Sequence, residues 1–391
     1  MKKVIILGAT GSIGSSSLSI IRQFPEQFCL LGISAHTNSE GLAGIAGEFN
    51  PPFVALADES RVSVFRERLP SYQGEILVGE AGLCELASSD DADIVIAGIV
   101  GVAGLRPVEA ALRAGRRVLL ANKESLVCAG EQLTNIAKTC GGTLLPIDSE
   151  HSAIFQLLEG RTEGDLASIT LTASGGPFWQ KDRQFLAGVT PEQAVRHPRW
   201  SMGAKISIDS ATLVNKALEL IEAAWFFNLT EDRIGIVIHP ESIIHSLVSF
   251  QDGTQFAQLS VPDMCGPIGY AMAYPGHRLR GVMKPLRLGE IGALTFAPID
   301  NERFPAPALA RDCLRSGGNA SAVFNIVNEG AVALFTQGLL RFVDIVPLIE
   351  RGVARFFEPS APSVEEIIDL TRRLLAWVEE EGPRHTGGSL S

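Results

Sequence analysis

Residues 4–14 read VIILGATGSIG, a short apolar run that passes directly into a glycine-rich turn. The apolar run predicts a buried strand, and the residues that follow the turn, 15–24, predict a helix. Glycines at such a junction allow a tight turn and let the amides at the helix start approach a pyrophosphate. The spacing is GxxGxxG rather than GxGxxG, so a plain glycine-rich turn is the alternative interpretation. We interpret the stretch as the first unit of a doubly wound, Rossmann-like α/β domain that binds a dinucleotide.

The same alternation of strand and helix continues to about residue 147. We expect further strands at 30–34, 53–57, 94–97, 118–121 and 143–146, with helices at 39–48, 107–113 and 131–139 between them. Strands that are apolar along nearly their whole length, separated by helices, indicate a parallel sheet covered on both faces. We therefore predict that residues 1–147 form an NADP-binding domain.

The end of the second strand favours NADP over NAD as the cofactor. An NAD-specific site places an acidic residue about 20 residues after the glycine turn, where it binds the ribose 2′-hydroxyl. Here that position carries His36, Thr37 and Asn38, and there is no Lys or Arg from Gln23 to Ser60. The 2′-phosphate would have to rely on these three residues, on backbone donors or on a base from elsewhere in the chain. We expect a smaller preference for NADPH over NADH than a cationic site would give.

The pattern changes after residue 147. Segments 168–172, 234–238 and 255–260 are strand-like and alternate with helical stretches, so we predict an α+β domain at 148–274. The acidic residues considered below make it the candidate catalytic and metal-binding domain. A proline-rich linker at 275–306 and an all-α helical module at 307–391 follow, with helices at 307–316, 320–337, 342–356 and 363–381. A loop at about 186–204 carries Trp200 and Met202 between prolines and glycines. We interpret it as a lid that excludes water from a ligand, the alternative being an aromatic plug over a domain seam.

Two acids follow the predicted strand at 143–147. If the chain stays extended there, Asp148 and Glu150 point the same way, and two converging carboxylates attract a hard divalent cation. The alternative is a pair of solvated turn acids. Lys123 follows the neighbouring strand 118–121 and can reach the same sheet edge as an electrophile or cation, although any lysine at a strand end can simply be solvated.

A second constellation lies in residues 210–219, SATLVNKALE. In a helix, Asn215 and Glu219 lie one turn apart on one face with Lys216 beside them. Glu219 is a candidate third oxygen ligand, its alternative being a helix-surface acid, and Ser210, Asn215 and Lys216 offer the donors that a phosphate needs. Without a Cys/His cluster, Mg²⁺ or Mn²⁺ is favoured over zinc.

Three further features of the sequence carry weaker signals. Ser174 and the two glycines after it resemble a second anion cradle, with a structural turn as the equal alternative. His239 and His245 are better explained as hydrogen-bonded structural histidines than as ligands.

Composition limits the classes of partner. The 391 residues carry a formal net charge of −11, which disfavours nucleic acid, and no apolar run is long enough to cross a membrane. The N-terminus reads as a first strand rather than a signal peptide, and six scattered cysteines without metal-site spacing indicate reduced thiols. We expect a soluble cytoplasmic protein.

These motifs, in this order, resemble those of the 1-deoxy-D-xylulose 5-phosphate reductoisomerase family over essentially the whole chain. The segments that carry the resemblance are GATGSIG, LLANKESLV, PIDSEHSAIFQ, SGGPF, HPRWSMG, DSATLVNKALE, HPESIIHS and NIVNE. The resemblance implies a metal site of Asp148, Glu150 and Glu219. It implies substrate contacts from Ser149, Glu150, Ser174, His197, Ser210, Asn215 and Lys216, with Lys123 near the reacting atoms. We also expect Trp200, on the predicted lid, and Glu219, beside the metal, to contact the substrate. The resemblance implies nucleotide contacts from Thr10, Gly11, Ser12, Ile13, Asn38, Asn122, Glu124 and Gly203. His36 and Thr37 depart from the family, which commonly shows glycine followed by Lys, Arg or Ser.

The resemblance also implies the reaction. A divalent cation assists a retro-aldol/aldol rearrangement of the ketose phosphate, and hydride from NADPH then reduces the branched aldehyde to 2-C-methyl-D-erythritol 4-phosphate, in non-mevalonate isoprenoid biosynthesis. A homodimer is also implied. Two alternatives are an NADP-dependent dehydrogenase of another sugar phosphate, which leaves the three carboxylates unexplained, and a non-enzymatic redox sensor, which needs no lid and no Lys123.

Overall fold

The computed structural model describes residues 1–196, 200 and 203–382. The chain forms two compact units, and both of them are assembled from separate segments. The first unit takes residues 1–125, 132–152 and 263–284, and the second takes 126–131, 153–262 and the chain from 285 onward. Segments far apart in the sequence therefore build each unit.

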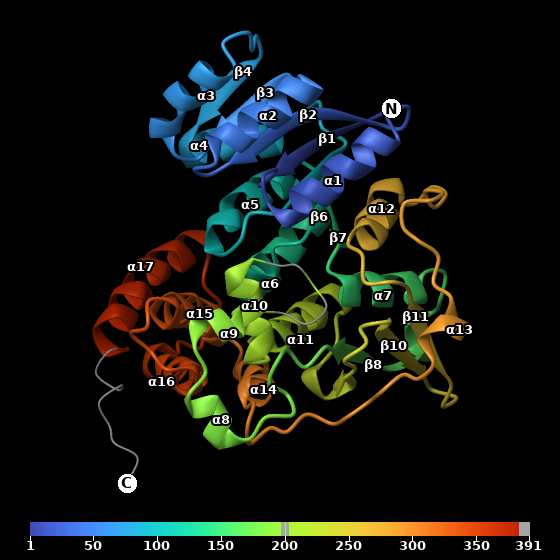
Figure 1. Cartoon of the computed structure of the whole chain (residues 1–391), viewed down its shortest axis with the longest axis vertical. Coiled ribbons are helices and arrows are strands. Elements are labelled where there is room, and N and C mark those ends of the chain that lie inside the picture. The colour runs from blue at the N-terminus through green and yellow to red at the C-terminus, as the bar shows by residue number, and fades with distance from the viewer. Residues whose placement is uncertain (197–199, 201–202, 383–391) are drawn as a thin grey trace. The chain divides into compact units, whose positions relative to one another are not determined.

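The first unit is built on a seven-stranded parallel sheet in the order β4-β3-β2-β1-β5-β6-β7 (Figure 1). The strands are β1 (Lys2–Leu7), β2 (Phe28–Ala35), β3 (Phe53–Leu56), β4 (Glu75–Val78), β5 (Ile94–Ala97), β6 (Arg117–Leu120) and β7 (Thr143–Pro146). Val4, Ile5 and Ile6 of β1 are completely buried, as a central parallel strand requires. The doubly wound sheet predicted from the alternating pattern is confirmed.

Helices connect these strands and leave the carboxyl edge of the sheet to the turns. They are α1 (Ser12–Gln23), α2 (Ser39–Phe49), α3 (Val62–Arg68), α4 (Gly79–Ser88), α5 (Leu105–Arg113) and α6 (Lys123–Cys140, of which 126–131 belong to the second unit), with 3₁₀ turns η1 (Glu59–Arg61) and η2 (Val102–Gly104). The strand order reverses beside β1, because β2 lies on one side of it and β5 on the other. Ligands of open α/β sheets bind in the crevice at such a switch point.

A helix from a distant part of the chain completes this unit. α12 (Cys265–Ala273) packs against α1, β6 and β7. The Nζ of Lys2 donates to the carbonyl of Met272 at 2.9 Å, and Arg117 Nη1 donates to the carbonyl of Tyr274 at 2.8 Å. Two cations thus satisfy carbonyls at the end of α12, where the helix dipole favours positive charge.

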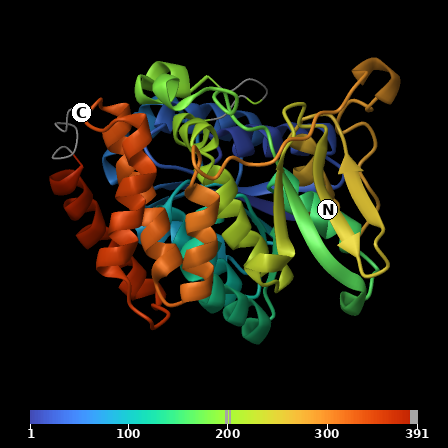
Figure 2. The same cartoon turned by 90° about the horizontal axis from the view of Figure 1, so that it is seen from below.

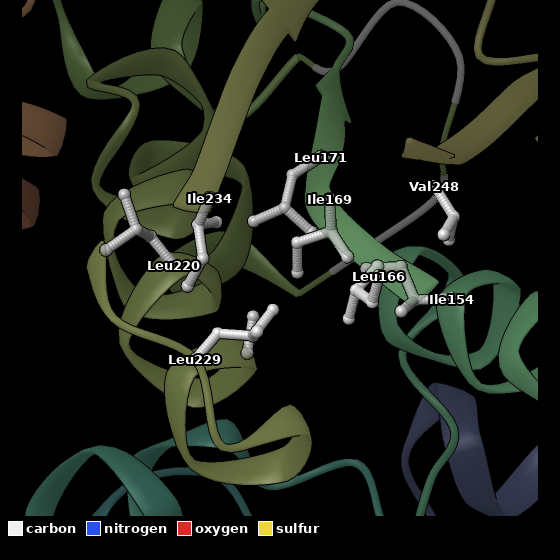
Figure 3. Packing of buried hydrophobic residues seen from close by; sticks show 9 residues of the cluster. Ile154, Leu166, Ile169, Leu171, Leu220, Leu229, Ile234 and Val248 are labelled. Carbon is white, nitrogen blue, oxygen red and sulfur yellow. The ribbon is translucent and has the colours of Figure 1, made fainter. Parts of the chain in front are cut away.

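The second unit contains a four-stranded mixed sheet in the order β11-β10-β8-β9. The strands are β8 (Leu166–Ala173), β9 (Ile234–Ile238), β10 (Ile244–Phe250) and β11 (Gln255–Leu259), with only the β8–β9 pair parallel. Figure 3 shows its hydrophobic core, in which Ile169 and Leu171 of β8 lie close to Leu220 and Ile234. This apolar layer anchors the sheet to the helix that carries Leu220.

Helices make up the rest of the second unit. They are α7 (Ser149–Leu158, in this unit from Ala153), α8 (Arg183–Ala187), α9 (Pro191–Ala194), α10 (Ala204–Ala211), α11 (Val214–Phe227), α13 (Leu288–Ile291), α14 (Ala306–Ser316), α15 (Ala320–Thr336), α16 (Ile345–Phe356) and α17 (Val364–Glu381), with 3₁₀ turns η3 (Glu163–Asp165), η4 (Glu231–Arg233) and η5 (Phe342–Asp344). α15 packs against α14, α16 and α17, the orange and red helices of Figure 2. The four C-terminal helices predicted from periodicity are confirmed, and they share a unit with the four-stranded sheet.

Candidate functional site

The glycine-rich turn joins β1 to α1 as predicted. Gly8 has φ +82°, and a Cβ there would lie 2.9 Å from the carbonyl oxygen of Gly98. A Cβ at Gly14 would lie only 2.2 Å from the carbonyl oxygen of Ala9. These two glycines are therefore required by backbone conformation and packing, and they bring the start of α1 close to the end of β1.

Gly11 differs from the other two glycines of the turn. A Cβ there would meet only the Gly8 carbonyl oxygen, at an ordinary distance of 3.4 Å, so packing does not demand a glycine. Gly11 caps the N-terminus of α1 and is exposed together with Ser12, while Thr10 and Ile13 are half-buried. Amides in the first helical turn have no intrahelical acceptor, and the helix dipole favours an anion there. The turn thus leaves an open approach for a pyrophosphate.

The end of β2 presents His36, Thr37 and Asn38, which are all exposed. Asn38 Oδ1 accepts a hydrogen bond from the amide of Gly41 at 3.0 Å and so caps α2. Within β2, the hydroxyl of the buried Ser34 accepts from the amide of Gly8 at 3.1 Å. This bond ties the end of β2 to the glycine turn, so the two predicted nucleotide-binding segments are neighbours in the first unit.

Residues 122–124 follow β6 and are almost fully buried. Asn122 caps α6 by accepting from the amide of Ser125 at 2.9 Å, and its side-chain nitrogen donates to the carbonyl of Gly101 at 2.9 Å. Lys123 begins α6, and its Nζ lies 2.6 Å from Oδ2 of Asp148. The predicted reach of Lys123 to the carboxyl edge of the next strand is confirmed.

Asp148 and Glu150 lie where β7 gives way to α7. The prediction of an extended segment is wrong, because β7 ends at Pro146 and α7 begins at Ser149. Asp148 Oδ1 accepts from the amide of Ser149, the first residue of α7, at 2.9 Å, and the hydroxyl of Ser149 donates to Glu150. One oxygen of each carboxylate lies within 4.8 Å of the other, so the two acids still converge.

In the second unit, the predicted anion cradle packs against the predicted phosphate donors. Gly175 and Gly176 have φ of +80° and +64°, and the amide of Gly176 donates to Ser174 Oγ at 3.2 Å. A Cβ at Gly176 would lie 2.7 Å from the carbonyl oxygen of Ser210. Because only glycine allows this approach, the Ser174 turn and the end of α10 are held side by side.

Glu219 accepts from two neighbours on α11. Its two carboxylate oxygens take a hydrogen bond from Asn215 Nδ2 and an ion pair from Lys216 Nζ. The side chains of Lys216 and Glu219 are 4% and 1% exposed. The predicted one-turn spacing is confirmed, and the alternative of a solvated helix-surface acid is excluded by burial.

A buried network that was not predicted is centred on Asp209, which precedes Ser210 in α10. Asp209 Oδ2 pairs with Lys205 Nζ at 2.8 Å, and Asp209 Oδ1 accepts from Asn328 Nδ2 of α15 at 3.0 Å. Asp209 is 1% exposed and Asn328 is fully buried. The four-residue spacing of Lys205 and Asp209 was the available signal, whereas a partner more than a hundred residues away could not be read from spacing.

The predicted lid lies only partly within the described residues. His197 and Met202 lie outside them, while Gly203 caps α10 and the half-buried Trp200 has its ring 6.4 Å from that of His245. His245 Nε2 is hydrogen-bonded to Ser260 at 2.8 Å. His239 accepts from the amides of Ile243 and Ile244 and faces the carbonyl of Thr295, which confirms its structural role.

All six cysteines, at 29, 84, 128, 140, 265 and 313, lie in the described part of the chain and are free thiols, as predicted. Among the described residues, no helix combines the length and apolar character that a membrane crossing requires.

Family models and relatives agree on one assignment. Models described as 1-deoxy-D-xylulose 5-phosphate reductoisomerase, its C-terminal domain, and the DXP reductoisomerase C-terminal domain match residues 4–130, 144–227 and 259–375. The chain is 46% identical over 375 residues to the protein of that name from Laribacter hongkongensis, covering 95% of this chain and 96% of the relative. It is 45% identical over 388 residues to that from Gloeobacter violaceus, covering 98% and 99%.

Solved structures indicate the same family as the family models and the relatives. A DOX-P reductoisomerase in complex with NADPH, fosmidomycin and magnesium is 38% identical, covers the whole of both chains and has a TM-score of 0.93. The Zymomonas mobilis 1-deoxy-D-xylulose 5-phosphate reductoisomerase in complex with NADPH is 39% identical with a TM-score of 0.90, covering 97% of this chain and 98% of its own.

Proposed function

The chain belongs to the 1-deoxy-D-xylulose 5-phosphate reductoisomerase family, and we propose how its own residues divide the work of that reaction. The enzyme is an NADPH- and divalent-metal-dependent oxidoreductase that rearranges the ketose phosphate and reduces the product. The observation that carries the residue assignment is the ion pair of Lys123 with Asp148, at the sheet edge where α/β folds bind ligands.

The nucleotide lies on the first unit in this proposal. Gly11, with Thr10, Ser12 and Ile13, receives the pyrophosphate at the start of α1, since the open face of Gly11 lets a phosphate approach the amides. His36, Thr37 and Asn38 face the adenosine ribose. Further contacts are assigned to Asn122 and Glu124 of the same unit, and the family resemblance adds Gly203, which caps α10 of the second unit.

The divalent cation takes Asp148, Glu150 and Glu219 as ligands. The donors are all carboxylate oxygens, which suits Mg²⁺ or Mn²⁺, and the convergence of Asp148 and Glu150 supports the first two. When bound, the cation acts as a Lewis acid toward substrate oxygens. Lys123 neutralises Asp148 and adds positive charge where an oxyanion develops.

The substrate phosphate is assigned to the cradle formed by Ser174, Ser210, Asn215 and Lys216. The close packing of Gly176 on Ser210 supports this, because it fixes two hydroxyl donors side by side. Binding energy from this remote group holds a short substrate in register for the rearrangement. Ser149, Glu150, Glu219, His197 and Trp200 complete the proposed substrate contacts, with the loop at about 186–204 excluding water.

We further propose a division of roles along the chain. Residues 1–147 bind the nucleotide and supply Lys123, and residues 148–274 carry the metal ligands and the other catalytic groups. Residues 275–306 are a linker, and residues 307–391 form a supporting helical module. We also propose a homodimer in the cytoplasm. β11 forms one edge of its sheet and exposes 40% of Phe256, which offers a surface for a second copy, and six free thiols suit a reducing compartment. Light scattering on the eluting protein tests the dimer, and a monomeric mass at micromolar concentration would contradict it.

The decisive experiment supplies the purified protein with the ketose phosphate, Mn²⁺ and NADPH and follows nicotinamide absorbance. We expect loss of absorbance that depends on all three components and stops with a chelator. Asp148→Asn serves as the matched inactive variant. Turnover that persists in that variant at the wild-type rate would overturn the metal assignment.

A further inference from the structure

The turns around the end of β2 determine how the protein can recognise the extra phosphate of NADPH. β2 pairs with β3 along its second half, with Ala35 opposite Leu56, and the two strands lie side by side in Figure 1. Beyond the strands the contact continues, because the amide of Ala57 donates to the carbonyl of Ala35 at 3.0 Å and that of Asp58 to the carbonyl of His36 at 3.4 Å. The turn after β3 is therefore part of the surface that receives the ribose.

Positive charge on this surface is scarce. The chain has no Lys or Arg from Gln23 to Ser60. Of the turns that follow β1, β2 and β3, at 8–11, 36–38 and 57–61, the last one supplies a permanent cation, Arg61, at the end of η1. Hydroxyls, an imidazole and backbone amides alone would have to compensate a dianionic phosphate without it.

Arg61 is held in a way that allows it to change partner. Its Nε lies 3.5 Å from Oδ2 of Asp58, with the two side chains 46% and 31% exposed. An ion pair this long and this exposed contributes little to stability. Asp58 has other partners, since its Oδ1 accepts from the amide of Ser60 at 3.0 Å and from its hydroxyl at 2.6 Å. The Ser60 hydroxyl, and more weakly Arg61 and His36, hold the pKa of the Asp58 carboxyl below its usual range.

We propose that Arg61 recognises the 2′-phosphate of NADPH, by leaving Asp58 and pairing with the phosphate beside His36 and Thr37. The guanidinium is planar and always charged, which suits bidentate phosphate recognition. The Asp58 carboxylate remains nearby and repels the phosphate, so this chain prefers NADPH over NADH by less than a site with an unopposed cation. The inference rests on the proposed nucleotide site.

The test measures binding rather than turnover. Isothermal titration of the full chain with NADPH and with NADH, without substrate or metal, gives both dissociation constants for each variant. For Arg61→Ala we expect NADPH to bind about tenfold more weakly and NADH to change by less than about twofold. Arg61→Lys retains the charge and should fall between wild type and Arg61→Ala. Asp58→Asn keeps the cap acceptor but removes the repulsion, so NADPH should bind about threefold more tightly.

Arg113→Ala is the matched control. Like Arg61, Arg113 is an exposed arginine in an ion pair with a nearby acid, here Glu109 at 2.6 Å. It is the last residue of α5, which leads to the amino end of β6, so it lies away from the carboxyl edge of the sheet where the nucleotide is proposed to bind. Both constants should stay at their wild-type values in this control. Equal weakening of NADPH and NADH in Arg61→Ala, or no change in either, would overturn the inference. A wild-type protein that bound neither cofactor would instead refute the nucleotide site itself, and the inference with it.

Discussion

Nζ of Lys123 lies 2.6 Å from Oδ2 of Asp148, with the two side chains only 9% and 17% exposed. The two residues follow neighbouring parallel strands, β6 and β7, whose carboxyl ends meet at one edge of the sheet. Each charge therefore depends on the other for its stability in a position largely withdrawn from water. In the proposed metal site, the same pair would supply a cation and a ligand oxygen to one point.

Lys123→Met tests this dependence. The substitution keeps the aliphatic stem but removes the charge, so we expect turnover to fall by about a hundredfold or more, as for other groups that stabilise an oxyanion. The free energy of unfolding should fall by about 3 kcal/mol, because Asp148 loses its counter-charge. Turnover by nicotinamide absorbance and urea unfolding measure the two effects. Lys3→Met is the matched control, since its ion pair with Asp91 is 45% and 65% exposed and should affect neither quantity.

Glu219→Gln separates metal binding from folding. The amide can still accept from Asn215 or Lys216 but carries no charge, so Mn²⁺ should bind at least about tenfold more weakly and turnover should be lost. Lys216 also loses the carboxylate that faces its buried ammonium, so the free energy of unfolding should fall by about 3 kcal/mol. Electron paramagnetic resonance of free Mn²⁺ measures the affinity. Asp369→Asn, from an exposed i,i+3 pair with Arg372, is the control, and equal Mn²⁺ affinity in Glu219→Gln and wild type would exclude Glu219 as a ligand.

Local patterns predicted much of the fold and of the site. The apolar strands and the glycine turn predicted the parallel sheet correctly, because each of these signals is contained in a few consecutive residues. The helix α12 and the strand β10 were not predicted. α12 begins CGPIG, a run of poor helix formers, and it is stabilised by packing on α1 and by the cations Lys2 and Arg117. Such support comes from residues far away in the sequence.

The site shows the same limit. Asn215, Lys216 and Glu219 were placed correctly because helical spacing alone brings them together. The extended geometry expected at Asp148 was wrong, since α7 starts one residue later and turns the chain. Asn328 could not be anticipated as the partner of Asp209, because that contact depends on how α15 packs against α10.

Asn328→Ala tests the buried network. The change removes the hydrogen bond from Asn328 to the Asp209 carboxylate and keeps the ion pair of Asp209 with Lys205. It also leaves a cavity at a fully buried position. We expect a loss of about 2–3 kcal/mol in unfolding free energy, the cost of an unmade hydrogen bond to a buried charge. Urea unfolding followed by circular dichroism measures it. Asn135→Ala, at an exposed position of α6, should stay within about 0.5 kcal/mol of wild type, and an equally small effect at Asn328 would contradict the network.

Alkylation should distinguish the free thiols. Cys140 is exposed, whereas burial raises the pKa of Cys313 to about 12 and those of Cys84 and Cys265 to about 11. The thiolate is the reactive form, and a raised pKa keeps its fraction small at neutral pH. Iodoacetamide at neutral pH should therefore label Cys140 first and leave Cys313 unmodified, with labelling of the buried thiols rising as the pH is raised. Peptide mass spectrometry measures the order, and full labelling in urea is the control.

Leu213 stands at the corner between α10 and α11 with φ +59°, a left-handed conformation that costs a leucine about 1–2 kcal/mol. Leu213→Gly removes that strain but also removes a side chain that is 2% exposed, and truncating a buried leucine costs about 3–5 kcal/mol. The second effect is larger, so the variant should be less stable by about 2 kcal/mol. The corner positions Ser210 and Asn215, so the KM for the ketose phosphate should rise more than kcat falls. Urea unfolding and steady-state kinetics separate the two effects. A variant more stable than wild type would mean that the strain outweighs the packing.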